Sequence, residues 1–275
     1  MILSRINVEL SSRCNKSCPM CGRRKLEKEH PDKCGWGDMP VELAYKIAEQ
    51  IPAGAIVQLH NNGESLLHPH FGRCLSFFKH CITGLNSNGI LLVEKANELI
   101  GNIDTLTISV IQDDDPQLAK EQIANVRHFL KLKGDRKPHM VYRLLGKVDD
   151  KVWRQFPGIV ATRPLHAADG SFDYAKPVTV PEMGICLDLL TSISIDRFGR
   201  VFPCVRFNPD GLSQIGDVNH ASLDEIVNSI ENHPWHKGKH LRKHYVSLHV
   251  QGRRSEVPLC ARGPCSYYGV PRGVN

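Results

Sequence analysis

The sequence predicts an α/β protein: a partial (β/α)6 barrel over residues 1–176 and a small C-terminal α+β domain over residues 177–275. Two observations lead to this fold class. In the first part, short segments that alternate polar and apolar residues are each followed by a helical pattern. After about residue 170, this alternation gives way to a β-hairpin pattern. Strands that alternate with helices form parallel sheets with right-handed crossovers, which curl into a barrel.

Six strand-and-helix units are expected along the first part, the last of them incomplete. Strands are predicted at 5–10, 55–60, 82–86, 105–111, 139–145 and 158–162. Helices are predicted at 40–51, 71–79, 91–100 and 116–133, with a helical turn at 149–155. In the last part we expect a linker at 177–181, a hairpin at 190–202, and helices at 222–230 and 235–245.

Composition excludes several classes of protein. Apolar residues make up 41% of the chain and charged residues 23%, which rules out wholesale disorder and collagen-like repeats. No signal-peptide pattern opens the chain and no run of 18 apolar residues occurs, so we expect a cytoplasmic protein with no membrane span.

The net charge of +6 is concentrated in residues 231–275, which hold eight Lys or Arg and two Glu. Few aromatic residues lie among these charges, so nucleic acid is not the favoured partner. A solvated basic helix, which would include the histidines at 233, 236, 240 and 244, is the simpler reading, and an anionic partner remains open.

Ten cysteines in a chain without a secretion signal favour metal or redox chemistry over disulfides. Cys14, Cys18 and Cys21 follow the first predicted strand directly, so three thiolates share one loop. A structural zinc site, the alternative here, needs four ligands. Three thiolates on a [4Fe–4S] cluster leave one iron able to bind a small molecule, which suits catalysis.

The Cys-x3-Cys-x2-Cys spacing after a first strand resembles the radical S-adenosylmethionine (SAM) superfamily, whose members have a partial TIM-like barrel. The resemblance implies that the three cysteines hold a [4Fe–4S] cluster whose open iron binds SAM. Reduction by a flavodoxin- or ferredoxin-type donor then yields a 5′-deoxyadenosyl radical, which abstracts hydrogen from a substrate. Met20 stands where the family usually has an aromatic residue and mostly offers its backbone to adenine.

Other segments resemble the SAM-binding loops of this family. Asn62-Gly63-Glu64 resembles its Gly-Gly-Glu-Pro loop, in which the glutamate holds the SAM ammonium group. Asn86-Ser87-Asn88-Gly89 and Ser109 resemble the turn after the third strand and a serine of the fourth. An ordinary loop acid and ordinary turn residues are the alternatives. From the resemblance we expect SAM contacts from Met20, Asn62, Gly63, Glu64, Asn86, Ser87 and Ser109.

A second cysteine group resembles the SPASM/Twitch extension of radical SAM enzymes. With four cysteines, the shorter Twitch-like form fits, which implies one auxiliary [4Fe–4S] cluster and two clusters in all; structural zinc is the alternative. The last two cysteines are spaced Cys-x4-Cys, where the family usually has Cys-x2-Cys. The expected ligands are Cys186, Cys204, Cys260 and Cys265. The remaining cysteines, Cys34, Cys74 and Cys81, are expected to be inert thiols.

Arg143, Arg163 and His166 are the expected catalytic and substrate-contacting residues. An arginine suits a carboxylate, phosphate or hydroxyl partner, and a histidine can take a proton during oxidation. The resemblance favours oxidation of a hydroxyl-bearing carbon in a small polar molecule, with the auxiliary cluster taking an electron. The alternatives are a maturase that modifies a peptide or protein, for which no leader-binding domain is expected before the first strand, and a non-catalytic zinc or iron–sulfur protein.

Overall fold

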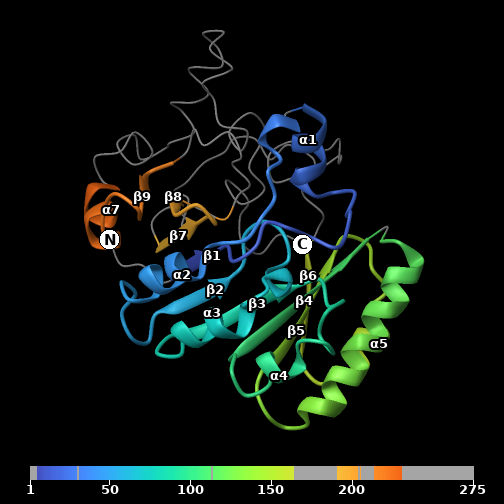
Figure 1. The fold of residues 1–275 in the computed structure, drawn as a ribbon. Coiled ribbons are helices and arrows are strands. Elements are labelled where there is room, and N and C mark those ends of the chain that lie inside the picture. The colour runs from blue at the N-terminus through green and yellow to red at the C-terminus, as the bar shows by residue number, and fades with distance from the viewer. Residues whose placement is uncertain are drawn as a thin grey trace.

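The computed structural model describes residues 5–29, 31–112, 114–163, 191–203, 205 and 214–230. These residues form a nine-stranded sheet in the order β6-β5-β4-β3-β2-β1-β7-β8-β9 (Figure 1). The strands from β6 across to β7 pair in parallel, and β8 and β9 add to the β7 edge in antiparallel fashion. The parallel α/β architecture predicted from the sequence is therefore confirmed.

The bounds of the elements are as follows. The strands are β1 Arg5–Val8, β2 Ile56–Leu59, β3 Ile82–Ser87, β4 Thr105–Ile111, β5 His139–Leu145, β6 Ile159–Arg163, β7 Ser192–Ile195, β8 Arg200–Phe202 and β9 Gly216–Asp217. The α-helices are α1 Gly22–Glu29, α2 Val41–Ala48, α3 Phe71–Phe77, α4 Ala96–Leu99, α5 Pro116–Lys133 and α7 Leu223–Ser229. The short 3-10 helices of the described residues are η1 Pro31–Lys33, η2 Ser65–Leu67 and η3 Trp153–Gln155.

Most predicted elements are present, and β4, α5 and β5 match their predicted bounds. The largest differences concern two helices. The helix expected at 91–100 is reduced to α4, because 91–95 form turns, and α1 was not predicted because its sequence GRRKLEKE carries no apolar stripe. The predicted linker at 177–181 and helix at 235–245 lie outside the described residues.

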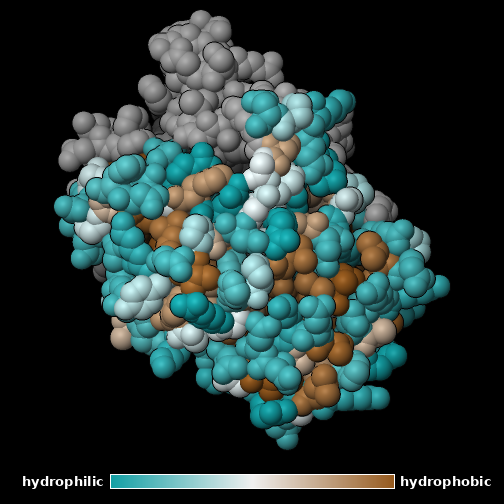
Figure 2. Space-filling model, in the orientation of Figure 1, coloured by the Kyte–Doolittle hydropathy of each residue, from teal (hydrophilic) through white to brown (hydrophobic). Residues whose placement is uncertain are grey.

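Helices α2 to α5 cover one face of the sheet (Figure 1). Most strand side chains on this face are apolar and buried, and they include Val57, Leu59, Leu85, Leu106 and Ile108, each at 0% exposure. The outer surface of the helices is mostly hydrophilic, with apolar side chains showing between the elements (Figure 2). Within the described residues, no helix is long and apolar enough to span a membrane.

The predicted hairpin is present but does not stand apart from the barrel sheet. β7 pairs in parallel with β1, with Asn7 opposite Ser194, and β8 returns beside β7. The turn between them is closed by Asp196, whose carboxylate accepts the backbone N–H groups of Phe198 and Arg200 at 3.0 Å each. The predicted domain boundary between residues 176 and 177 falls outside the described residues.

Candidate functional site

The loops that follow the parallel strands meet at one edge of the sheet, which we call the rim. The rim comprises the three-cysteine loop after β1, the loop at 60–64 after β2, Ser87 at the end of β3 with the turn at 88–89, and the loop after β4 that contains Asp114. In α/β barrels the active site lies at this edge, the carboxyl ends of the strands. The sequence-predicted cofactor loops therefore share one edge.

Cys14, Cys18 and Cys21 lie close enough to influence one another electrostatically. Their loop is tightened by the Cys21 N–H, which donates to the Cys18 carbonyl at 3.1 Å, and it leads directly into α1. Burial raises the pKa of Cys18 to about 12 and raises that of Cys21 as well. Without a metal the Cys18 and Cys21 thiols keep their protons, and binding a metal would release them.

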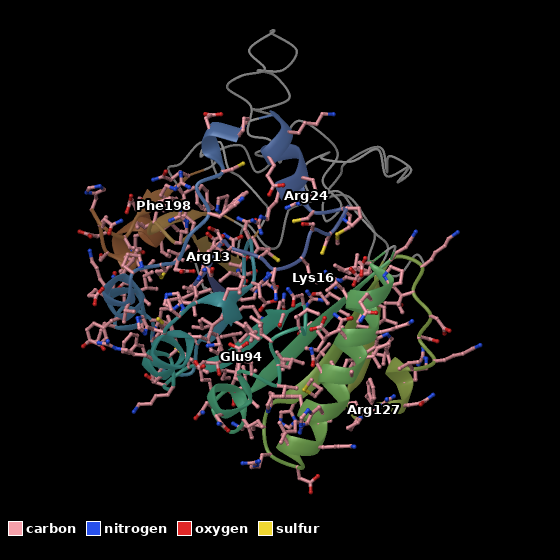
Figure 3. The ribbon with its side chains drawn as sticks, turned by 45° about the vertical axis from the view of Figure 1, so that its right-hand side comes forward. Arg13, Lys16, Arg24, Glu94, Arg127 and Phe198 are labelled. Atoms are coloured by element: carbon pink, nitrogen blue, oxygen red, sulfur yellow. The ribbon has the colours of Figure 1, made fainter. Side chains whose placement is uncertain are left out.

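A buried ion pair joins the three-cysteine loop to the loop after β4. Lys16 Nζ donates to Asp114 Oδ2, and the two side chains are only 1% and 9% exposed. The ammonium group lies near Cys18 and Glu64, where its charge opposes the effect of burial on both pKa values. Figure 3 shows sulfur atoms gathered between Lys16 and Arg24. The rim thus places a buried cation beside the thiols.

Glu64 is buried at 1% exposure between two rim loops. Its Oε2 accepts the Asn88 N–H at 2.7 Å and the Ser87 hydroxyl at 3.2 Å, and its Oε1 accepts the Leu66 N–H at 3.2 Å. Burial raises its pKa to about 7 against these hydrogen bonds. The carboxyl group is therefore held in a fixed orientation with its charge state balanced near neutral pH.

Gly63 allows the loop after β2 to touch the three-cysteine loop. It adopts φ +74°, and a Cβ atom there would lie 2.5 Å from the Ser11 carbonyl oxygen and 2.6 Å from that of Arg13. The Glu64 N–H donates to the Arg13 carbonyl at 2.7 Å across the same contact. Only glycine fits this backbone conformation at this distance.

The other predicted SAM-binding residues occupy four positions. Met20 is partly buried in the three-cysteine loop, and Asn62 is partly buried beside Gly63. Ser87 donates to Glu64 and accepts the Gly89 N–H at 3.0 Å, so its hydroxyl braces the rim. Asn86 and Ser109 lie on the sheet face opposite the helices, where Asn86 accepts a hydrogen bond from Gln58 at 2.9 Å.

Several rim residues were missed by the sequence analysis. The turn after β3 contacts the three-cysteine loop through Asn88, whose Nδ2 donates to Asn15 Oδ1 at 2.6 Å and lies 3.9 Å from Cys14 Sγ. Asp114 could have been suspected as an acid placed directly after a strand, whereas Lys16 gave no signal beyond its place between two cysteines.

Glu9 is a second buried carboxyl group at the rim, at 3% exposure, and it was also missed. Its Oε2 accepts the Asn62 N–H at 3.1 Å and its Oε1 lies 3.5 Å from the Arg197 N–H, so it joins the loop after β2 to the β7–β8 turn. Burial, and then the neighbouring Asp196 carboxylate, raise its pKa to about 7.

The predicted substrate residues Arg143 and Arg163 lie on β5 and β6, at the edge of the parallel strands farthest from β1. Arg143 is a partly buried residue of β5 and stands opposite Ser109 in the β4–β5 register. Arg163 is exposed at the end of β6. His166 lies outside the described residues, as do Cys186, Cys204, Cys260 and Cys265. Of the remaining cysteines, Cys74 and Cys81 are buried and Cys34 is partly buried.

Comparison with known protein families identifies the C-terminal part. Residues 186–262 match SPASM, an iron–sulfur cluster-binding domain. A relative from Pyrococcus furiosus, the tungsten-containing aldehyde ferredoxin oxidoreductase cofactor-modifying protein, is 32% identical over 93 residues. That alignment takes in 32% of this chain and 24% of the relative, so the chain matches about a quarter of the relative's length.

Solved structures with bound S-adenosylmethionine resemble most of the chain. BtrN in complex with AdoMet and 2-DOIA has a TM-score of 0.54 at 17% identity, over 98% of this chain and 96% of that one. Native anSMEcpe with bound AdoMet has a TM-score of 0.63 at 15% identity, over 86% and 83%. Streptococcus suis SuiB bound to S-adenosylmethionine has a TM-score of 0.54 at 12% identity, over 82% and 65%.

The chain has the radical SAM fold with a SPASM-type C-terminal region. The SPASM match contains Cys186, Cys204 and Cys260 but ends before Cys265. The fold and the SPASM match agree with the resemblance seen in the sequence.

The described rim residues fit a cluster with three protein ligands. No group of three His, Cys, Asp or Glu side chains in the described part of the chain is arranged to hold one metal ion. A [4Fe–4S] cluster does not require that arrangement, because each thiolate binds a different iron atom. Arg23 is only 5% exposed and stacks on Trp36 at 4.1 Å, yet its Nε and Nη1 have no hydrogen-bond partner among the described residues. Buried donors near Cys21 suit the sulfur atoms of a cluster.

Proposed function

We propose that this protein is a radical SAM enzyme that oxidises a hydroxyl-bearing carbon of a small polar molecule. Its SAM-binding [4Fe–4S] cluster would be held by Cys14, Cys18 and Cys21. An auxiliary [4Fe–4S] cluster, held by Cys186, Cys204, Cys260 and Cys265, would take up an electron during the oxidation. The observation that supports this most directly is the contact of the three-cysteine loop with Gly63 and Glu64 at the carboxyl ends of β1 and β2.

When bound, the cluster and SAM supply a 5′-deoxyadenosyl radical that abstracts hydrogen from the substrate. The chain's own residues bind and orient these groups. Glu64 accepts the SAM ammonium group in a charge-assisted hydrogen bond and is held for this by Ser87. Asn62 and Gly63 offer backbone groups beside it, and Met20 offers its backbone to adenine. Asn86 and Ser109 contribute from the sheet.

The substrate side of the site is assigned to β5, β6 and the residues that follow β6 in the sequence. Arg143 orients a polar group of the substrate from β5, beside Ser109. Arg163 acts at the end of β6. His166 is assigned from its place in the sequence, and its imidazole takes the hydroxyl proton during oxidation. A flavodoxin- or ferredoxin-type protein donates the electron that starts the reaction.

A second candidate is the modification of a peptide or protein side chain. Two of the similar structures contain peptides: SuiB bound to the precursor peptide SuiA, and anSMEcpe with AdoMet and the Cp18Cys peptide. The two candidates differ in substrate, and share SAM cleavage and the rim residues. A panel of polyols, sugars and serine-containing peptides, read by mass spectrometry for the loss of two hydrogens, separates them.

The first test is SAM cleavage by anaerobically reconstituted protein in the presence of dithionite, with 5′-deoxyadenosine measured by chromatography. We expect Cys18→Ala to abolish 5′-deoxyadenosine formation, because one of three thiolate ligands is lost. Cys81→Ala, which removes a buried thiol at the opposite end of β3, should retain it. Wild-type protein that forms no 5′-deoxyadenosine would leave only a non-catalytic zinc or iron–sulfur protein.

A further inference from the structure

The face of the sheet opposite helices α2 to α5 carries polar side chains on five neighbouring strands. Side chains alternate between the two faces of a strand, and register partners in parallel strands share a face. Asn7 stands opposite both Gln58 and Ser194, and Asn86 stands opposite Thr107. The polar face, as we call it, consists of Asn7, Gln58, Asn86, Thr107, Ser109 and Ser194.

Two amides at the centre of the polar face are joined to each other. Gln58 Nε2 donates to Asn86 Oδ1 at 2.9 Å, which lays the Gln58 side chain across β3. Gly84, the register partner of Gln58, makes room for it: a Cβ atom there would lie 2.3 Å from Gln58 Oε1. The amide pair can therefore adopt this arrangement only because Gly84 has no side chain beneath it.

This amide pair retains hydrogen-bonding capacity. Each amide has further donors and acceptors, and among the described residues Gln58 Oε1 and Asn86 Nδ2 make no other hydrogen bond. The Ser194 hydroxyl on the same face is buried and also lacks a partner in the described part of the chain. The Gln58 Oε1 acceptor and the Asn86 Nδ2 donor therefore lie side by side. They match a molecule with two adjacent hydroxyl groups, because one hydroxyl can donate a hydrogen bond while its neighbour accepts one.

The polar face is also uncharged. Its six side chains are amides and hydroxyls, and charged residues stand at its borders: Arg5 at the start of β1, Glu9 just after β1, and Arg143 on β5. A phosphate or carboxylate ligand would need a cation or several converging N–H donors, whereas hydroxyl groups pair well with amides. The chemistry of this face therefore favours a neutral ligand.

We propose that the Gln58–Asn86 amide pair recognises a neutral molecule with adjacent hydroxyl groups, such as a cyclitol or sugar, and is a specificity determinant of this enzyme. The inference rests on the proposed function, in which such a molecule is the substrate. It adds Gln58 and Gly84 to the site, neither of which lies on the rim. One hydroxyl donates to Gln58 Oε1 while its neighbour accepts from Asn86 Nδ2, so that in this proposal the Asn86 amide contacts the substrate in place of SAM.

The test is calorimetric titration of the SAM-loaded, reconstituted protein with neutral probes: myo-inositol, scyllo-inositol and glucose. Charged and peptide controls are myo-inositol 1-phosphate and N-acetyl-Ala-Ser-Ala-amide. We expect at least one neutral probe to bind, and its dissociation constant to rise about tenfold or more in Gln58→Leu, as for the loss of one good hydrogen bond. Gly84→Ala, which displaces the Gln58 amide, should weaken the same probe without removing any polar group.

Three results would overturn the proposal: no neutral probe binds, the phosphate ester or the peptide binds more tightly, or both variants bind like the wild type. The melting temperature of each variant checks that it is folded. The outcome is separable from the proposed function, because 5′-deoxyadenosine formation with dithionite needs no substrate. Probe binding without SAM cleavage would retain the site and reject the enzyme, and SAM cleavage without probe binding would do the reverse.

Discussion

The rim and the polar face belong to the same sheet but satisfy their polar groups differently. At the rim, charged groups are buried and paired: Lys16 with Asp114, and Glu64 with three donors. On the polar face, uncharged groups such as Gln58 and Ser194 keep hydrogen-bonding capacity within the described residues. A prebuilt charged network suits charged cofactors, and open neutral groups suit an uncharged ligand. Substitutions at the rim should therefore destabilise the protein more than substitutions on the polar face.

The largest effect on stability is expected for Lys16→Met. This change leaves Asp114 buried without its cation, and removing one partner of a buried pair typically costs about 3–5 kcal/mol. We expect a marked fall in melting temperature together with loss of iron, because the ion pair holds the three-cysteine loop against β4. Thermal unfolding and iron content of the reconstituted protein measure both effects.

An exposed ion pair supplies the control. Lys137 pairs with Asp104, but the two side chains are 53% and 27% exposed, and exposed pairs contribute about 0–1 kcal/mol. Lys137→Met should therefore change the melting temperature little. A Lys16→Met, Asp114→Leu double variant should recover much of the lost stability, because no buried charge is left alone. Equal effects at Lys16 and Lys137 would contradict the special position of the rim.

Glu64→Gln tests the charge of the proposed SAM contact. The variant keeps the size of the side chain but loses the carboxylate, and a hydrogen bond to a charged group contributes about 1.5–3 kcal/mol. We expect the SAM dissociation constant to rise about 10- to 100-fold in anaerobic equilibrium dialysis with labelled SAM. Glu9→Gln is the matched control, because Glu9 is also buried at the rim but faces Asp196 rather than Lys16. Equal weakening by both variants would argue against a direct role for Glu64.

Sequence patterns predicted the strands, the helices and the loops that meet at the rim, because these depend on residues close together in the chain. The strand and helix at 105–111 and 116–133 carry clear periodicity and end at their predicted residues, and Asp115 before Pro116 marks the helix start. The pairings of Lys16 with Asp114 and of Gln58 with Asn86 join residues far apart in the chain. No local pattern specifies such a pairing, because it depends on which strands lie side by side.

The two buried glutamates should give the protein a pH-dependent stability. Burial raises the pKa of Glu9 to about 7 from 4.5, so the folded state holds a proton that the unfolded chain releases. The contribution of Glu9 to the free energy of unfolding is fully present below about pH 4.5 and is lost as pH rises through 7. Between these values the free energy of unfolding falls by up to about 1.4 kcal/mol per pH unit. Glu64 contributes in the same direction.

Melting temperatures from pH 5 to pH 8 measure this dependence, which should be a decline. Glu9→Gln cannot titrate and should flatten the decline without abolishing it, because Glu64 still titrates. A melting temperature that rises over this interval would mean that Glu9 is ionised in the folded protein. In that case the hydrogen bonds from Asn62 and Arg197, which lower the pKa of Glu9, outweigh burial and the Asp196 carboxylate, which raise it.

The smallest effect is expected on the polar face, and its sign is the informative part. The Ser194 hydroxyl is buried without a partner among the described residues, and such a group costs about 1–3 kcal/mol. Ser194→Ala should therefore raise the melting temperature by a few degrees. Ser87→Ala, the rim counterpart, removes a hydroxyl that donates to Glu64 and accepts from Gly89, so it should lower the melting temperature. Changes in melting temperature of opposite sign would show that the Ser194 hydroxyl lacks a hydrogen-bond partner in the folded protein, whereas the Ser87 hydroxyl has its partners at the rim. If Ser194→Ala also lowers the melting temperature, its hydroxyl already has a partner in the folded protein, and the face has less capacity for a ligand than its geometry indicates.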